Sequence, residues 1–156
     1  MQIRTFRFIA AALIAAVFHG VVFAAGEHAG KDDAVAFVKK AAAYLKQNGK
    51  DKALEEFNNP KGQFIDGELY VVVLDMNGVL LADGTKPRLV GKSLADIKDV
   101  NGKQFVREEI DLAKSKGKGW VDFQWVNPVT KAMEHRSSYI ERVGDLIVLA
   151  GVYNQR

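Results

Sequence analysis

Aromatic side chains, a histidine and an arginine are concentrated between residues 119 and 139 of this 156-residue chain. Aromatic walls exclude water, and an arginine held within them can bind a carboxylate through two parallel hydrogen bonds. We choose Arg136 as that cation. The pattern predicts a ligand-binding site formed by Trp120, Phe123, Trp125, His135, Arg136 and Tyr139.

The pairing across a predicted hairpin decides which of these side chains share a face. With a five-residue loop at 127–131, Val126 faces Ala132 and Asp122 faces Arg136. One face then carries Val121, Phe123, Trp125, Met133, His135 and Tyr139, and the other carries Trp120, Asp122, Gln124, Glu134 and Arg136. A slip of one residue exchanges the sets. Two interpretations of Arg136 therefore stay open: a carboxylate-binding cation, or a surface partner of Asp122 that contributes little energy.

No residue set in the chain predicts catalysis or metal binding. Of three histidines, only His135 lies in the predicted folded domain, and no Ser–His–acid set has a recognisable local signature. The Asp-x-Asn-Gly stretches at 75–78 and 99–102 place glycine too early for an EF-hand loop and are typical of tight turns. The chain has no cysteine, which removes disulfides and thiolate chemistry. We expect no catalytic residue, no metal and no cofactor.

The first 25 residues differ in composition from the rest of the chain. Arg4 and Arg7 are their only charges, followed by an apolar run and by small residues, as in a secretory signal peptide. Cleavage after Ala24 or Ala25 predicts a signal at 1–24, a linker at 25–31 and a periplasmic location. The alternative is an uncleaved apolar segment that anchors the protein in the membrane.

Charge argues against a nucleic-acid partner. The formal net charge of the full chain is +3, and it falls to +1 once Arg4 and Arg7 are removed with the signal. A nearly neutral protein lacks the electrostatic footprint of a phosphate-binding surface.

Hydrophobic periodicity predicts one α+β domain over residues 32–156. A long helix capped by Asp32 or Asp33 ends near Gly49, and a short helix follows at 50–57. Strands are expected at 69–74, 79–82, 119–126, 132–142 and 146–153, with another helix at 103–116 between the second and third. The segments at 69–74 and 146–150 are apolar on both faces, which places them inside a five-stranded antiparallel sheet.

The order and spacing of several motifs resemble the bacterial single Cache domain of type 2, in a soluble stand-alone form. The resemblance covers residues 32–153. Its motifs are Ala53–Asn58 with Pro60, Gly67–Gly78, Leu89–Leu94, Asp99–Lys103, Gly119-Trp120, Trp125–Pro128, Arg136–Tyr139 and Gly151–Tyr153. The family likeness implies a PAS-like antiparallel sheet behind a long N-terminal helix, an extracytoplasmic sensor role, and binding of short organic acids.

Carried over by position, the resemblance assigns the family's basic residue to Arg136 and its aromatic partner to Tyr139, with Trp125 and Phe123 beside them. Two departures stand out: Asp83 replaces a histidine found in many members, and Phe123 lacks the hydroxyl of a tyrosine. We expect an anionic organic ligand, a membrane receptor or kinase that reads the bound state, and a monomer rather than a homodimer. The alternative is an envelope accessory protein whose pocket is no longer used.

Overall fold

The computed structural model describes residues 29–154. The signal peptide predicted for 1–24 and most of the predicted linker lie outside the described residues, as do the last two positions. None of the helices within 29–154 combines the length and the apolar character that a bilayer crossing demands.

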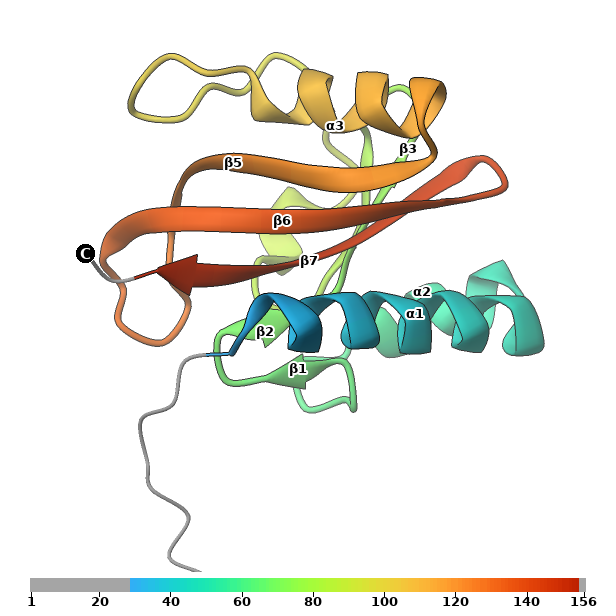
Figure 1. The fold of residues 1–156 in the computed structure, drawn as a ribbon. Coiled ribbons are helices and arrows are strands. Elements are labelled where there is room, and N and C mark those ends of the chain that lie inside the picture. The colour runs from blue at the N-terminus through green and yellow to red at the C-terminus, as the bar shows by residue number, and fades with distance from the viewer. Residues whose placement is uncertain (1–28, 155–156) are drawn as a thin grey trace, which may run out of the picture.

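Five strands form one antiparallel sheet in the order β4-β3-β7-β6-β5, so β7 lies at its centre (Figure 1). Their bounds are β3 Val72–Asp75, β4 Leu80–Asp83, β5 Lys118–Val126, β6 Met133–Val143 and β7 Leu146–Asn154. The α+β class, the five-stranded sheet and the interior positions of β3 and β7 confirm the predictions.

The predicted strand at 69–74 is divided. The backbone N–H of Val71 donates to the carbonyl of Phe64 at 3.1 Å, which takes this residue out of the main ladder. Two short strands, β1 (Ile65–Asp66) and β2 (Leu69–Tyr70), pair separately beside the main sheet.

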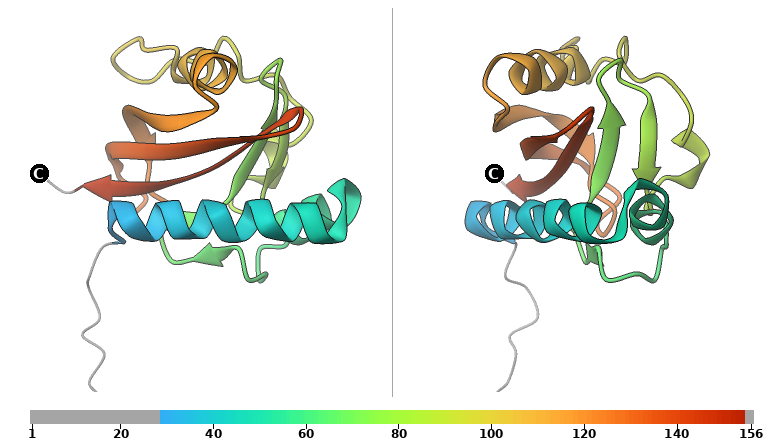
Figure 2. Two further views of the ribbon diagram at one scale, coloured as in Figure 1. Left: turned by 45° about the vertical axis from the view of Figure 1, so that its right-hand side comes forward. Right: turned by 90° about the vertical axis from the view of Figure 1, so that its right-hand side faces the viewer.

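The helix α1 (Lys31–Asn48) lies along one face of the sheet, next to the shorter α2 (Lys50–Phe57), as Figures 1 and 2 show. Its buried stripe includes Ala34, Val38, Ala41 and Leu45, which contact the sheet because they recur every three to four residues. The helix begins earlier than predicted, with Gly30 rather than an aspartate at the cap. The Gly30 N–H donates to the Asp33 carboxylate at 2.8 Å, so Asp33 still stabilises the first turn.

The helix α3 (Phe105–Ser115) covers the opposite face of the sheet (Figure 1). The loop between β4 and α3, which includes the 3-10 helix η1 (Pro87–Leu89), packs on the same face. The sheet therefore separates two apolar clusters, one beneath α1 and one beneath α3. A layer with helices on both faces can hold a site on either side.

The predicted register of the β5–β6 hairpin is wrong by one residue. Val126 pairs with Met133, so Arg136 faces Phe123 and Asp122 faces Ser137. The physical cause is a longer loop, 127–132, closed by the Asn127 N–H donating to the Ala132 carbonyl at 2.9 Å. The Asn127 side chain adds a second closure, because its Oδ1 accepts the N–H of Val129 at 2.8 Å.

Candidate ligand-binding site

A cavity of about 40 Å³ lies between the sheet and α3. Its walls are mostly aliphatic and aromatic, with three ionisable side chains among them. The lining residues are Val72, Leu74, Leu80, Asp83, Leu89, Leu94, Phe105, Val106, Glu109, Phe123, Trp125, Arg136 and Leu149. A few water molecules or a ligand of a few heavy atoms would fill this volume.

The guanidinium of Arg136 is the central polar group of the cavity. In the observed register Arg136 shares a face with Phe123, and the residue is buried, with only 2% of its surface exposed. Its Nη1 donates to the hydroxyls of Tyr70 and Tyr153. Its Nε and Nη2 are buried and have no hydrogen-bond partner within residues 29–154. A buried cation with unpaired donors is costly unless an acceptor meets it.

Aromatic rings enclose the arginine. The guanidinium carbon lies 4.5 Å from the ring centroid of Tyr70 and 5.3 Å from that of Tyr153, within the range of cation–π attraction. The two phenols share a hydrogen bond of 3.0 Å, and Tyr153 also donates to the Val126 carbonyl. Their hydroxyls are therefore already engaged, which holds the arginine in one orientation.

The strand β7 makes room for this arginine with a glycine. Gly151 pairs with Ser138 across the ladder, and a Cβ at Gly151 would lie 2.4 Å from the Arg136 Nε. That distance is too short for any side chain. The glycine of the Gly-Val-Tyr motif is thus a steric requirement for the buried guanidinium.

Two of the predicted aromatic residues line the cavity. Phe123 stacks on Phe105 from α3, with centroids 3.9 Å apart and planes 6° from parallel. Trp125 meets the Phe105 ring edge-on at 5.2 Å, and the Lys86 ammonium lies 5.3 Å from the Trp125 ring centroid. Phe123, Trp125 and Arg136 therefore come together as expected for one site.

The other three predicted residues lie on the opposite face of the sheet. Trp120 and Tyr139 pack against each other at 5.3 Å in the cluster beneath α1. His135 also points to that face, because it pairs with Gln124, one residue from Trp125. The structure does not bring Trp120, His135 or Tyr139 to the Arg136 cavity.

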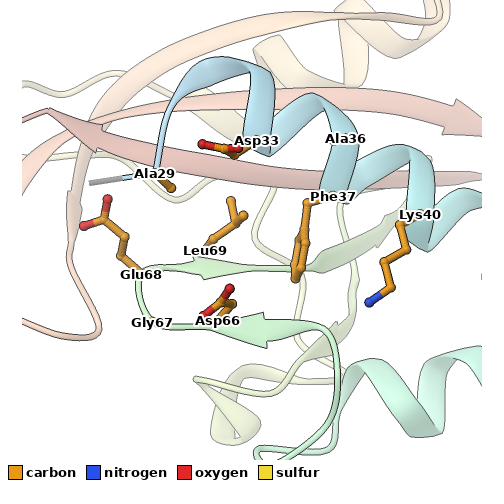
Figure 3. A pocket seen from close by; sticks show the side chains of 9 residues that line it. All are labelled: Ala29, Asp33, Ala36, Phe37, Lys40, Asp66, Gly67, Glu68 and Leu69. Carbon is orange, nitrogen blue, oxygen red and sulfur yellow. The ribbon is translucent and has the colours of Figure 1, made fainter. Parts of the chain in front are cut away.

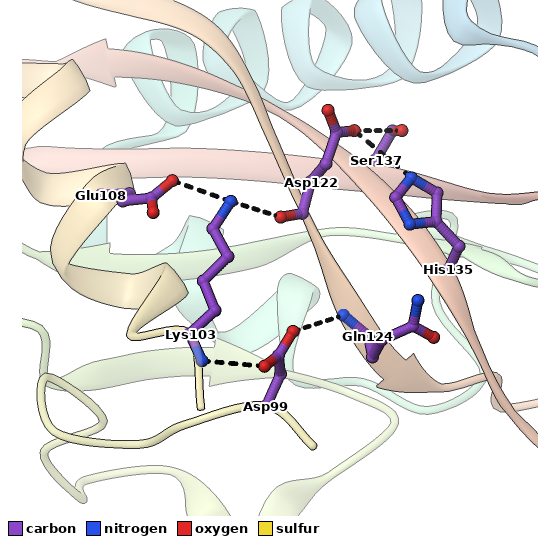
Figure 4. A network of polar contacts seen from close by, with 7 residues as sticks. All are labelled: Asp99, Lys103, Glu108, Asp122, Gln124, His135 and Ser137. Carbon is purple, nitrogen blue, oxygen red and sulfur yellow. Dashed lines mark hydrogen bonds and ion pairs between the residues drawn. The ribbon is translucent and has the colours of Figure 1, made fainter. Parts of the chain in front are cut away.

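His135 instead joins a polar cluster on the sheet surface (Figure 4). Its Nε2 lies 3.8 Å from an Asp122 oxygen that also accepts a hydrogen bond from Ser137. Nearby, the Asp99 carboxylate accepts the backbone N–H groups of Gln124 and Lys103 at 3.0 and 2.9 Å. Serine donates to the aspartate and not to the histidine, so the cluster lacks the relay of a hydrolase triad.

Asp83, which stands where many family members have a histidine, lines the cavity at the end of β4. One of its oxygens accepts from the Thr85 hydroxyl and from the N–H groups of Thr85 and Lys86. Its charge also raises the pKa of Lys86, although burial lowers that pKa by more. The carboxylate thus organises the loop at the cavity and is partly balanced by a neighbouring cation.

Glu109 is a site residue that sequence reasoning missed. It lies on the buried stripe of α3 with Phe105, Val106, Ile110 and Ala113, and it is 2% exposed. Burial raises the pKa of its carboxyl group to about 8, although the nearby Arg136 opposes this shift. The sequence did contain a signal: a glutamate occupies a position of the helix at which the periodicity places apolar residues.

A second, larger hollow of about 520 Å³ lies between α1 and the β1–β2 hairpin (Figure 3). Asp33, Asp66 and Glu68 contribute carboxylates to its lining, and Phe37 and Lys40 lie at one end. It contains none of the predicted site residues and no buried cation. We therefore place the candidate site in the smaller cavity, where unpaired buried donors require an acceptor.

Metal binding has no support among residues 29–154, where no group of three or more His, Asp or Glu side chains is arranged to hold an ion. The Asp75 oxygen that could ligate a cation accepts the N–H groups of Asn77 and Val79 instead. The Asp-x-Asn-Gly stretches at 75–78 and 99–102 form turns, as predicted.

The long helix α1 on one face of a five-stranded antiparallel sheet is the architecture that the resemblance to the single Cache domain implies. The chain belongs to the family described as single Cache domain 2, whose family model matches residues 34–154. The resemblance seen in the sequence is thereby confirmed.

Solved structures share this fold. A Cache chemosensory domain described for its recognition of carboxylic acids superposes with a TM-score of 0.71 at 24% identity, covering 80% of this chain and 92% of that one. A methyl-accepting chemotaxis protein from Vibrio parahaemolyticus gives 0.68 at 23%, covering 79% and 87%. A periplasmic sensor domain of a chemotaxis protein gives 0.63 at 23%, covering 80% and 90%.

Proposed function

We propose that this protein is an extracytoplasmic sensor that binds a short organic acid at Arg136 and passes its bound state to a membrane receptor or kinase. The observation that carries the proposal is the buried guanidinium whose Nε and Nη2 are unpaired in the described part of the chain. Folding buries this charge at a cost, and a ligand carboxylate supplies the missing acceptors.

The surroundings of the arginine favour a small acid over a large one. Phe105, Phe123 and Trp125 close the cavity above the sheet, and its volume is about 40 Å³. Acids of two to four carbons match these limits better than sugars or nucleotides. The loop that includes η1 contributes Leu89 and Leu94 to the lining, so ligand entry changes a surface that a partner can contact.

The alternative proposal is an accessory protein of the cell envelope that no longer uses its cavity. The small volume and the carboxylate of Asp83 support this alternative, because the volume opposes a bulky ligand and the negative charge opposes an anionic one. The two proposals differ in whether any carboxylate stabilises the folded protein.

Thermal unfolding in the presence of acetate, propionate, lactate and pyruvate tests the proposals. A ligand at one hundred times its Kd stabilises the folded state by about 2.7 kcal/mol, which raises Tm by roughly 10 °C in a domain of this size. Acetamide and propionamide lack the charge and serve as ligand controls.

The matched protein variants are Arg136→Met and Arg142→Met. Both residues lie on β6, but Arg142 is exposed and its Nε donates to the Gly144 carbonyl. We expect Arg136→Met to abolish the shift and Arg142→Met to retain it. A carboxylate shift that survives in Arg136→Met contradicts the proposed site, and no shift with any acid favours the accessory protein.

A further inference from the structure

We propose that Glu109 determines ligand specificity in this site: as a neutral carboxylic acid, it donates a hydrogen bond to the same ligand carboxylate that Arg136 binds. This inference rests on the proposed function. It assigns the ligand to the class of monocarboxylates without an ammonium group and couples binding to a proton kept on Glu109.

The geometry places the two groups in one cavity from different elements. Glu109 comes from α3 and Arg136 from β6, and both line the cavity. The Glu109 Oε1 is buried and has no hydrogen-bond partner in the described residues, like the Nε and Nη2 of Arg136. No direct ion pair joins them, so a small acceptor between them can engage both.

The charges around Glu109 favour its neutral form. Burial is the largest effect on its pKa, and Glu108 on the same helix acts in the same direction. Together they outweigh Arg136 and Lys103, which lower the pKa, and raise it to about 8. The cavity also carries Asp83, and the loop next to it carries Lys86. Burial raises the pKa of the Tyr70 phenol well above its ordinary value, so that hydroxyl stays neutral near pH 8.

A bound carboxylate strengthens this preference. Its negative charge beside Glu109 would repel an ionised side chain, and it cancels the effect of Arg136 on the glutamate. The protonated side chain instead offers one O–H donor, which the ligand oxygen accepts. A ligand ammonium group would instead require an ionised Glu109. A second carboxylate on the ligand would lie close to Glu109 or Asp83, because the cavity has a volume of only about 40 Å³.

The test is the affinity for propionate between pH 6 and pH 9, measured by isothermal titration calorimetry of the purified protein. If only the protonated form binds and the titration midpoint is near 8, affinity falls about tenfold from pH 7 to pH 9. At pH 8, calorimetry in buffers of different ionisation enthalpy should detect uptake of about half a proton per ligand.

Two variants isolate the role of Glu109. Glu109→Gln keeps the size and an N–H donor but cannot titrate, so its affinity should not depend on pH across this range. Glu108→Gln removes an exposed neighbour that pairs with Lys103 at 2.9 Å, and should keep the fall in affinity with rising pH. Its midpoint should move slightly lower, because the Glu108 charge raises the pKa of Glu109. A pH dependence that persists in Glu109→Gln assigns the titration to another group, such as Lys86, and overturns the inference.

The remaining outcomes separate this inference from the proposed function. Wild-type affinity that is independent of pH overturns the role of Glu109 alone. Affinity that rises with pH, with glycine or alanine binding better than propionate, means that Glu109 binds an ammonium group and also overturns it. No binding of any carboxylate at any pH overturns the proposed function itself. Carbon-13 NMR of the ligand-free protein gives an independent check, since a Glu109 midpoint below pH 6 contradicts the inference.

Discussion

Replacing Gly151 by alanine tests whether the backbone of β7 makes room for the buried arginine. A Cβ at this position would lie 2.4 Å from the Arg136 Nε, 2.7 Å from the Ser138 hydroxyl and 2.9 Å from the Ser137 carbonyl oxygen. The last contact is with backbone, and the first is with the middle of a side chain held at its tip by two phenols. Neither group can move freely, so the substitution strains the site.

The expected cost follows from overpacking. An extra methyl group in a packed interior costs about 1–3 kcal/mol, and three short contacts place this substitution in the upper half of that range. Displacement of the guanidinium would also break the charged hydrogen bond to a carboxylate that the proposed function requires, worth about 1.5–3 kcal/mol. Propionate affinity should therefore fall by about tenfold or more.

Urea unfolding measures the stability term, and calorimetry with propionate measures the binding term. Gly144→Ala is the matched control: Gly144 has φ +64° in the β6–β7 turn, and a Cβ there meets no atom within 4 Å. The only expected cost of Gly144→Ala is backbone strain, which should lower the free energy of unfolding by about 1 kcal/mol or more. Its affinity for propionate should be that of the wild type. If Gly151→Ala binds propionate as tightly as wild type, the proposed position of the arginine in the bound state is refuted.

Three further substitutions test the packing and charge arguments. Arg136→Met should leave the free energy of unfolding in urea unchanged or raise it, because it removes a buried charge whose Nε and Nη2 have no hydrogen-bond partner in the described residues; a loss above about 2 kcal/mol contradicts this. Asp99→Ala removes an acceptor of three backbone N–H groups and should cost about 2 kcal/mol at pH 7. The hydrogen bond from the Gln124 N–H is the largest cause of the lowered Asp99 pKa. The stabilisation by the Asp99 carboxylate is therefore present above about pH 4 and is lost on acidification. Acid titration of the wild type and the variant measures this loss. Asn127→Ala should cost about 2 kcal/mol and speed amide exchange in the β5–β6 loop, because the side chain holds Val129 and Glu134; unchanged exchange contradicts its closing role.

Much of the fold could be predicted because burial on two faces leaves a clear pattern. The segments that became β3 and β7 are apolar at consecutive positions, which only the interior of a sheet with both faces covered can satisfy. The α3 stripe follows a helical period, and each Asp-x-Asn-Gly stretch forms a turn with its aspartate accepting local N–H groups. These signals are local, so they can be read from one sequence.

The candidate site was harder because it depends on pairing between distant residues. The hairpin loop contains one residue more than expected, since Asn127 closes it at Ala132, and this difference moves Arg136 to the face of Phe123 and Trp125. Periodicity does not determine loop length. Glu109 was missed for another reason: a charged residue on an apolar stripe can equally mark an error in the assumed helix face.

The strand β6 carries Arg136 toward the cavity and Tyr139, three residues later, toward α1. About 10 Å of extended backbone joins the two, with no loop between them. Tyr139 packs on Trp120, and the ammonium of Lys31 at the start of α1 lies 5.0 Å from the centroid of that indole ring. If a ligand binds at Arg136 as proposed, a tilt of β6 would move Tyr139 as well, and continuous β-structure would carry the displacement to the surface beneath α1.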